Sequence, residues 1–139
     1  MWLSLGAPDA ILATQSFWKV GDTSPDGPAG KRTELWTLYS FGRAVESFLH
    51  VAHGGFLASL LDQQTGSIVI THPLSTNPRT VSSTIKYHKA LHTPGAVLCR
   101  SWISKVEGRK VWANAVLEDG TGALVAEMEA LWIFLRPSL

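Results

Sequence analysis

The stretch HGGFLASLLDQQTGSIVI, residues 53–70, decides how the rest of the sequence is interpreted. Its apolar residues recur at helical spacing between Phe56 and Leu61, and little polar surface is left between them. Residues 54–70 are therefore predicted to form a helix that is enclosed on most sides. Gly66 costs about 1 kcal/mol inside a helix relative to Ala, which is tolerable near the helix end or where another backbone comes close.

Extended segments flank this helix. Aromatic and β-branched residues in partial alternation predict strands at 33–41, 80–89, 96–106, 111–118 and 123–135. Turn signals at 107–110 and 119–122 join neighbouring strands as hairpins, so the sheet is predicted to be antiparallel. The alternation in the second strand places Thr80 and Ser82 on one face and Ser83 and Tyr87 on the other. One apolar helix and one sheet give an α+β fold, with the sheet wrapped around the helix.

Residues 1–32 are interpreted as a variable N-terminal segment that precedes a single domain at residues 33–139. Residues 10–20 are predicted to form a short helix, and the turn formers at 21–30 predict a flexible loop. The start lacks the basic region of a signal peptide, and no apolar run is long enough to span a membrane. We expect a cytoplasmic protein with no membrane partner, and location in an organelle remains an alternative.

Composition restricts the possible partners. Twelve Lys and Arg residues against eleven Asp and Glu leave a net charge of +1, so a general nucleic-acid binder is not expected. The single cysteine, Cys99, predicts a buried thiol and no internal disulfide. The pair His50 and His53 is too small a ligand set for a metal site, and no cofactor-binding motif is found. The 45% apolar content predicts a subunit interface.

The start of the predicted helix has a chemical use. Gly54 and Gly55 leave its first backbone N–H groups uncovered by side chains, and helix N-termini attract negative charge. Such a point can stabilise the oxyanion that forms when an acyl carbonyl is attacked. Close backbone packing is the structural alternative for the two glycines, and both explanations can hold together.

Asp62 is a carboxylate within an otherwise apolar helix, so it needs hydrogen-bond partners or a function. Burial would favour its protonated form, which suits a general base, and a structural carboxylate is the alternative. Eight residues separate Gly54 from Asp62, which is about 12 Å along a helix axis. One carbonyl cannot touch both on one helix. If both act on it, the site lies between two copies of the chain.

Residues 53–62 resemble the His-Gly-Gly…Asp signature of the PaaI-like and THEM4-like acyl-CoA thioesterases, which belong to the hotdog fold (the 4HBT superfamily). Segments 83–87, 93–95, 107–112, 117–120 and 126–132 resemble the family's later strands, so the resemblance covers roughly residues 33–135. It is most similar to fungal members. The resemblance implies a hotdog fold, in which an antiparallel sheet of five to six strands wraps around one long central helix.

The resemblance also implies roles for individual residues. The Gly54 N–H would form the oxyanion hole beside Gly55, and His53 would fix the geometry of the helix start. Asp62 of the partner chain would be the general base or nucleophile. Thr80 would hold the attacking water, with Ser82 as the reserve candidate. The implied assembly is a homodimer or homotetramer with its active site at the dimer interface, which hydrolyses an acyl thioester of coenzyme A or of a carrier phosphopantetheine.

Two departures from the family pattern leave alternatives open. Ser47 stands where the family often has Asn, and Gln63 follows the Asp where fungal relatives often have Glu. The chain could be a repurposed hotdog protein of secondary metabolism that acts on a polyketide-like substrate without hydrolysis, or a non-catalytic dimer that binds acyl ligands. Arg109 and Lys110 either contact the phosphates of the substrate or protect the sheet with charge.

Overall fold

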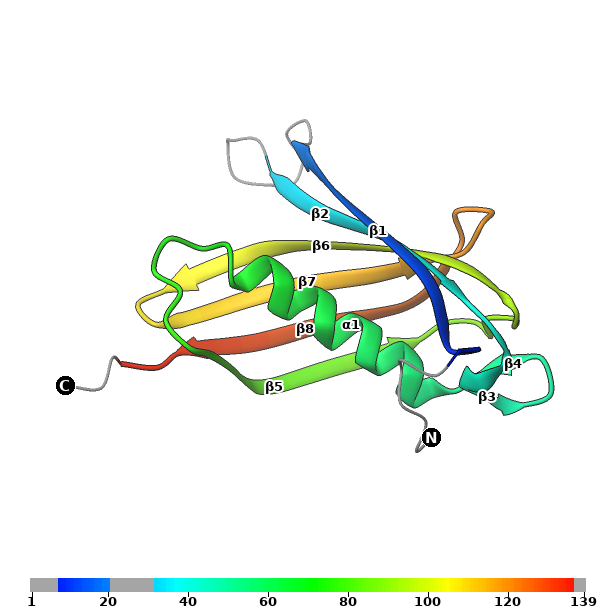
Figure 1. Ribbon diagram of the computed structural model, residues 1–139. Helices are drawn as coiled ribbons and strands as arrows, with labels where there is room; N and C mark the ends of the chain where they lie inside the picture. The colour runs from blue at the N-terminus through cyan, green and yellow to red at the C-terminus, as the bar shows by residue number, and fades with distance from the viewer. Residues whose placement is uncertain (1–7, 21–31, 137–139) are drawn as a thin grey trace.

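A computed structural model describes residues 8–20 and 32–136 of the chain. One helix, α1 (Gly54–Val69), lies against one face of a six-stranded antiparallel sheet (Figure 1), whose strands are ordered β1-β2-β6-β7-β8-β5. The strands of the sheet are β1 (Ile11–Val20), β2 (Thr33–Phe41), β5 (Pro78–Tyr87), β6 (Gly95–Glu107), β7 (Lys110–Glu118) and β8 (Leu124–Phe134). The predicted α+β architecture is confirmed, and the five strands predicted from the sequence are each found within two residues of their expected ends.

The N-terminal segment differs from the prediction. Residues 11–20 form strand β1 and not a helix, because the edge of β2 offers an antiparallel partner for the whole segment. The pairing is supported by a hydrogen bond of 2.9 Å between the hydroxyls of Ser16 and Thr37, and by the rings of Phe17 and Trp36, whose centroids are 5.7 Å apart. Strand β1 therefore belongs to the same sheet as the later strands. The flexible loop predicted at 21–30 lies outside the described residues.

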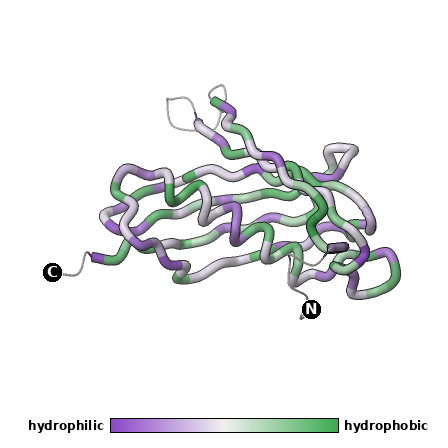
Figure 2. Tube along the Cα trace, in the orientation of Figure 1, coloured by the Kyte–Doolittle hydropathy of each residue, from purple (hydrophilic) through white to green (hydrophobic). Residues whose placement is uncertain are grey.

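The core lies between α1 and the strands β6, β7 and β8. Hydrophobic residues occur along all three strands (Figure 2), and every second side chain of β7 is fully buried. A Cβ atom added at Gly66 would lie 2.9 Å from Cη2 of Trp132, so an indole ring, and not a backbone, requires this glycine. Cys99 is fully buried as predicted, and burial raises the pKa of its thiol, which makes it a poor nucleophile.

Helix α1 buries one face only, which corrects the prediction of a helix enclosed on most sides. The buried face holds the large residues Phe56, Leu57, Leu60, Leu61, Ile68 and Val69 together with Gln64 and Thr65. The opposite face carries small and polar residues that stay at least partly exposed, namely Ala58, Ser59, Asp62, Gln63, Gly66 and Ser67. The hydrophobic residues between these positions made the whole helix look apolar in the sequence, although they all point to the sheet.

Strand β5 contains a bulge that re-aims its side chains. Thr80 pairs with the buried Trp132, whereas Ser82 pairs with Leu131, the next residue back along β8. One extra residue, Val81, is thus inserted, and a β-bulge of this kind changes the face to which the flanking side chains point. Thr80 therefore points to the helix side of the sheet and Ser82 to the opposite side. The strict alternation predicted for this strand is wrong at this point.

A short two-stranded sheet leads into the helix. It is formed by β3 (Glu46–Phe48) and β4 (Val51–Ala52), and it follows a single 3-10 turn, η1 (Arg43–Val45). His50 lies between its two strands with a φ of 63°, a left-handed conformation that side chains adopt at a cost. In the described part of the chain, no helix is long and apolar enough to cross a membrane.

Candidate active site

The first turn of α1 uses nearly all of its backbone donors within the chain. His53 is the N-cap residue, and its Nδ1 accepts a hydrogen bond of 2.8 Å from the Gly55 N–H. The carbonyl of His53 accepts from the N–H groups of Phe56 at 2.9 Å and Leu57 at 3.2 Å. The remaining donor of the first turn, the Gly54 N–H, has no hydrogen-bond acceptor among the described residues. One unused donor is thus left at the positive end of the helix dipole.

The side chain of Tyr87 covers this turn from β5. Its hydroxyl donates a hydrogen bond of 3.1 Å to the Gly54 carbonyl, and its ring lies 3.7 to 3.8 Å from where a Cβ of Gly54 would stand. The peptide unit between Gly54 and Gly55 is therefore held at both ends, because Tyr87 binds its C=O and His53 binds its N–H. Sequence reasoning assigned Tyr87 no role. The one indication in the sequence was its predicted position on one face of a strand.

Asp62 lies near the middle of α1, on the open face of the helix. Its side chain is exposed, so the burial expected from the sequence is not found in the single chain. Thr80 donates a hydrogen bond of 3.3 Å from its Oγ1 to Oδ1 of Asp62. The structure thus brings the predicted water-holding residue and the predicted base together within one chain. Ser82, the reserve candidate, points to the other side of the sheet.

A groove of about 710 Å³ begins at Asp62 and runs beside the second half of α1. Its lining includes the helix residues Gln63, Gly66 and Ser67, and Trp132 of β8. Gln63 donates from Nε2 to the Ser67 hydroxyl at 3.5 Å. Because Gly66 has no side chain, the groove reaches the helix backbone and the indole ring at this position. The groove therefore offers both an apolar surface and several hydrogen-bonding groups beside the carboxylate.

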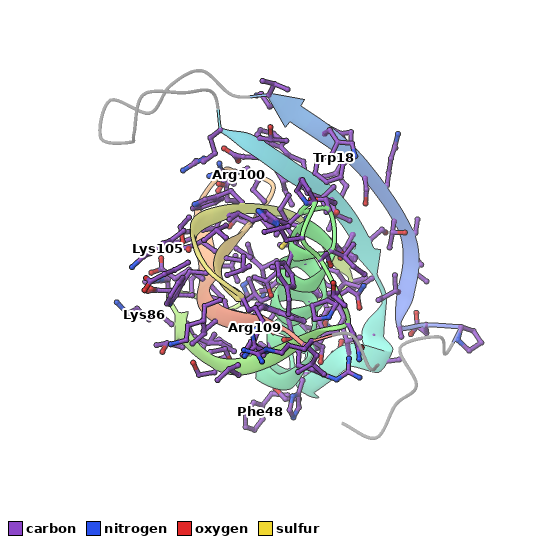
Figure 3. All side chains as sticks on the ribbon, turned by 90° about the vertical axis from the view of Figure 1, so that its left-hand side faces the viewer. Trp18, Phe48, Lys86, Arg100, Lys105 and Arg109 are labelled. Atoms are coloured by element: carbon purple, nitrogen blue, oxygen red, sulfur yellow. The ribbon has the colours of Figure 1, made fainter. Side chains whose placement is uncertain are left out.

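The other predicted residues lie away from these two groups. Ser47 is exposed on β3 and forms no side-chain hydrogen bond with a described residue. Arg109 and Lys110 lie at the hairpin between β6 and β7, where Arg109 donates from Nη1 to the Phe134 carbonyl at 3.4 Å. Figure 3 looks at this end of the molecule and shows Arg109 there, while Phe48, from β3, projects away from the body. Neither basic residue contacts Asp62 or Gly54.

The candidate groups offer acid–base and hydrogen-bond chemistry. In residues 8–20 and 32–136, no cluster of three or more His, Cys, Asp or Glu side chains could hold a metal ion. Because Nδ1 of His53 accepts a hydrogen bond, the ring proton of the neutral imidazole lies on Nε2. His53 thus acts as the N-cap of the helix.

A single helix against an antiparallel sheet that curves around it is the architecture of the hotdog proteins, and comparisons with known proteins agree. Residues 49–126, more than half of the chain, match the family model described as the thioesterase superfamily. The chain therefore belongs to the thioesterase superfamily.

One curated relative is acyl-coenzyme A thioesterase THEM4 of Mus musculus, which is 28% identical over 102 residues. The match covers 73% of this chain but only 43% of that protein, so the chain spans less than half of its relative's length.

Solved structures show the same fold. A hypothetical thioesterase of Streptococcus pneumoniae, solved with coenzyme A, superposes with a TM-score of 0.69 at 18% identity, covering 88% of this chain and 89% of that one. A mutant of the phenylacetic acid degradation protein PaaI from Thermus thermophilus gives a TM-score of 0.67 at 20% identity, covering 85% and 93%. The predicted hotdog fold and thioesterase family are thus confirmed, and a fungal origin stays a prediction.

Proposed function

We propose that the protein hydrolyses acyl thioesters to a free acid and a thiol, with the Gly54 N–H as oxyanion donor and Asp62 as general base. One observation carries this proposal above all. Among the described residues, the Gly54 N–H is the one first-turn donor of α1 without an acceptor, and the Thr80 hydroxyl of β5 is held against the Asp62 carboxylate on the open face of the helix. These are the groups that acyl transfer needs, a donor for the developing oxyanion and a base for the attacking water.

The site is shared between two chains in this proposal. Gly54 and Asp62 are separated by about 12 Å along the helix, so the carbonyl that meets one Gly54 has to meet the Asp62 of a partner. The open face of α1 supports this arrangement, because its small residues allow another helix to come close. Strand β5, at the edge of the sheet and exposed along most of its length, has an unpaired side that a second copy can join.

The reaction follows from these positions. The thioester carbonyl oxygen accepts from the Gly54 N–H, and a water molecule lies beside Asp62 and Thr80. Asp62 removes a proton as the water oxygen bonds to the carbonyl carbon, and the oxyanion that forms is stabilised at the helix N-terminus. The C–S bond then breaks, and the departing thiolate takes up the proton. Direct attack by Asp62 through an anhydride would use the same geometry.

Coenzyme A esters are the proposed substrates. The pneumococcal relative was solved with coenzyme A, and the mouse relative is named an acyl-coenzyme A thioesterase. In this proposal the groove beside Asp62 receives part of the bound ester, and Arg109 and Lys110 attract its phosphates at the nearby end of the sheet. An ester of a carrier-bound phosphopantetheine presents the same reacting group.

Thiol release from a panel of acyl-CoA esters tests the proposal, with wild type and Asp62→Asn assayed side by side. We expect the wild type to release thiol, and Asp62→Asn to lower kcat about 10²- to 10⁴-fold, the range for loss of a general base. The matched control is Glu129→Gln, which neutralises an exposed carboxylate on the far face of the sheet. A near-wild-type rate for Asp62→Asn would contradict its role. Acyl-CoA binding without thiol release would favour the non-catalytic or repurposed protein.

A further inference from the structure

The peptide unit between Gly54 and Gly55 is part of a chain of hydrogen bonds in which the bond to His53 is an ordinary N-cap, whereas the bond from Tyr87 is not required by a helix start. The Tyr87 hydroxyl donates to the carbonyl of this unit at 3.1 Å, and the N–H of the same unit donates to Nδ1 of His53 at 2.8 Å. Two side chains from separate elements, β5 and the N-cap, thus fix the orientation of one peptide plane.

This constraint matters for the Gly54 N–H because two adjacent glycines form the turn. Glycine is the residue with the widest choice of backbone conformations, so the turn that presents the Gly54 N–H would otherwise be the most adaptable part of the helix. An oxyanion donor stabilises charge only when it lies about 2.7 to 3.1 Å from the oxygen, in an orientation set before the reaction. The site therefore needs something outside the helix to hold the two glycines.

We propose that Tyr87 is a positioning residue for the oxyanion donor, an inference that rests on the proposed thioester hydrolysis. Its hydroxyl holds the Gly54 carbonyl and so keeps the free N–H of the same residue aimed at the substrate. It also polarises the peptide unit, which strengthens the N–H bond to His53 because linked hydrogen bonds reinforce one another. Tyr87 touches no reacting atom and acts through Gly54.

The surroundings of Tyr87 argue against a purely structural role. Its side chain is 53% exposed, so it contributes little to the buried core. In the described part of the chain its hydroxyl makes one hydrogen bond, the one to Gly54. The bulge in β5 places Thr80 and Tyr87 on the same side of the sheet, so one strand holds Asp62 at one end and Gly54 at the other.

The variant Tyr87→Phe removes the hydroxyl and keeps the ring against Gly54. We expect kcat for thiol release to fall about tenfold, the effect of one misdirected hydrogen bond, while KM stays within about twofold and the melting temperature is unchanged. Thr84→Val is the matched control. It also removes one hydroxyl from β5, but on the face away from the helix, and it should keep the wild-type kcat.

A pair of coenzyme A analogues separates positioning from packing. Tyr87→Phe should lose about tenfold in affinity for a trifluoromethyl ketone analogue, whose tetrahedral hydrate mimics the oxyanion. Affinity for the methyl ketone, which mimics the ground-state carbonyl, should stay constant. Equal losses for both analogues, or a wild-type kcat in Tyr87→Phe, would overturn the inference and leave thioester hydrolysis standing.

A third readout is independent of catalysis. Hydrogen exchange of the Gly55 amide, followed by NMR, should become several-fold faster in Tyr87→Phe and stay unchanged in Thr84→Val, because the bond from Gly55 to His53 loses its support. If the wild type hydrolyses no thioester, the proposed function fails. Exchange of the Gly55 amide then still decides whether Tyr87 holds this turn, and an unchanged rate would overturn that part.

Discussion

The first turn of α1 and the middle of the same helix are held in very different ways. Around Gly54, the side chains of His53 and Tyr87 bind the backbone, and the Gly54 N–H has no acceptor in the part of the chain that the structure describes. Around Asp62, a single hydrogen bond of 3.3 Å from Thr80 holds an otherwise exposed carboxylate. The backbone around the Gly54 N–H is thus fixed by contacts within one chain, whereas the Asp62 carboxylate stays exposed to water.

In the proposed function, the carboxylate half is the one that depends on a partner. A base works best where bulk water is excluded and its interactions are not screened. The single chain does not exclude water from Asp62, so in the proposed shared site a second chain covers the open face of α1. The small residues of that face leave room for a second helix, whose first turn would bring its own Gly54 N–H toward Asp62.

Among the variants that leave Asp62 unchanged, the largest effect is expected at the first turn. Gly54→Pro removes the free N–H and adds a ring at the first helical position, where proline is tolerated. His53, the residue before it, has a φ of −65° and a ψ of 134°, which suit a residue that precedes proline. Loss of one oxyanion donor should lower kcat about 10²- to 10³-fold.

Gly54→Ala is the matched control for this change. It keeps the N–H, and its Cβ would make ordinary contacts of 3.7 Å or more with Tyr87. It should therefore retain most of the activity in the same steady-state assay. Equal losses in Gly54→Pro and Gly54→Ala would mean that the turn matters for packing and not for its donor.

A smaller effect is expected at the middle of the helix. Thr80→Val keeps the shape of the side chain but removes the hydrogen bond to Asp62, and with it the proposed contact to the attacking water. We predict a decrease in kcat of about tenfold, because one hydrogen bond to a charged group is lost. Thr84→Val, on the other face of β5, provides the comparison. If both variants hydrolyse acyl-CoA at the same rate, Thr80 does not assist Asp62.

The smallest effect concerns stability alone. His50 adopts a φ of 63° in the hairpin that leads into the first turn, and its Nδ1 is 3.9 Å from Glu46, too far for a strong ion pair. His50→Gly should stabilise the fold by about 0.5 to 1 kcal/mol, since glycine adopts this conformation without strain. Urea denaturation would measure the gain, and thiol release should be unaltered. A loss of stability would show that the His50 side chain supports the hairpin.

The sequence predicted the elements near the helix better than those at the sheet edges. The helix from Gly54 and the strand 33–41 were found as expected because periodicity and turn residues agree there. Strand β1 was missed, since its pairing with β2 is a tertiary contact that outweighs local preference. The bulge at Val81 was also missed, although it decides that Thr80 and not Ser82 faces Asp62.

The sequence predicted candidate residues for the site, and their roles stay a prediction, whereas their surroundings could not be predicted. The spacing of Gly54 and Asp62 implies two chains if both groups act on one carbonyl, and the structure places Thr80 within hydrogen-bond distance of Asp62. The exposure of Asp62 was not predictable, because the apolar residues beside it all turn to the sheet. The contact from Tyr87 to Gly54 was not predictable either, because it depends on how β5 lies along the helix.

The most direct test of the shared site is complementation between two inactive variants. Asp62→Asn and Gly54→Pro chains would be co-expressed in equal amounts and assayed for thiol release. In a shared site, each mixed dimer contains one complete site, made from the intact Gly54 of one chain and the intact Asp62 of the other. Random pairing should then restore about a quarter of the wild-type activity. Activity no higher than that of the two variants measured separately would contradict a site built from two chains.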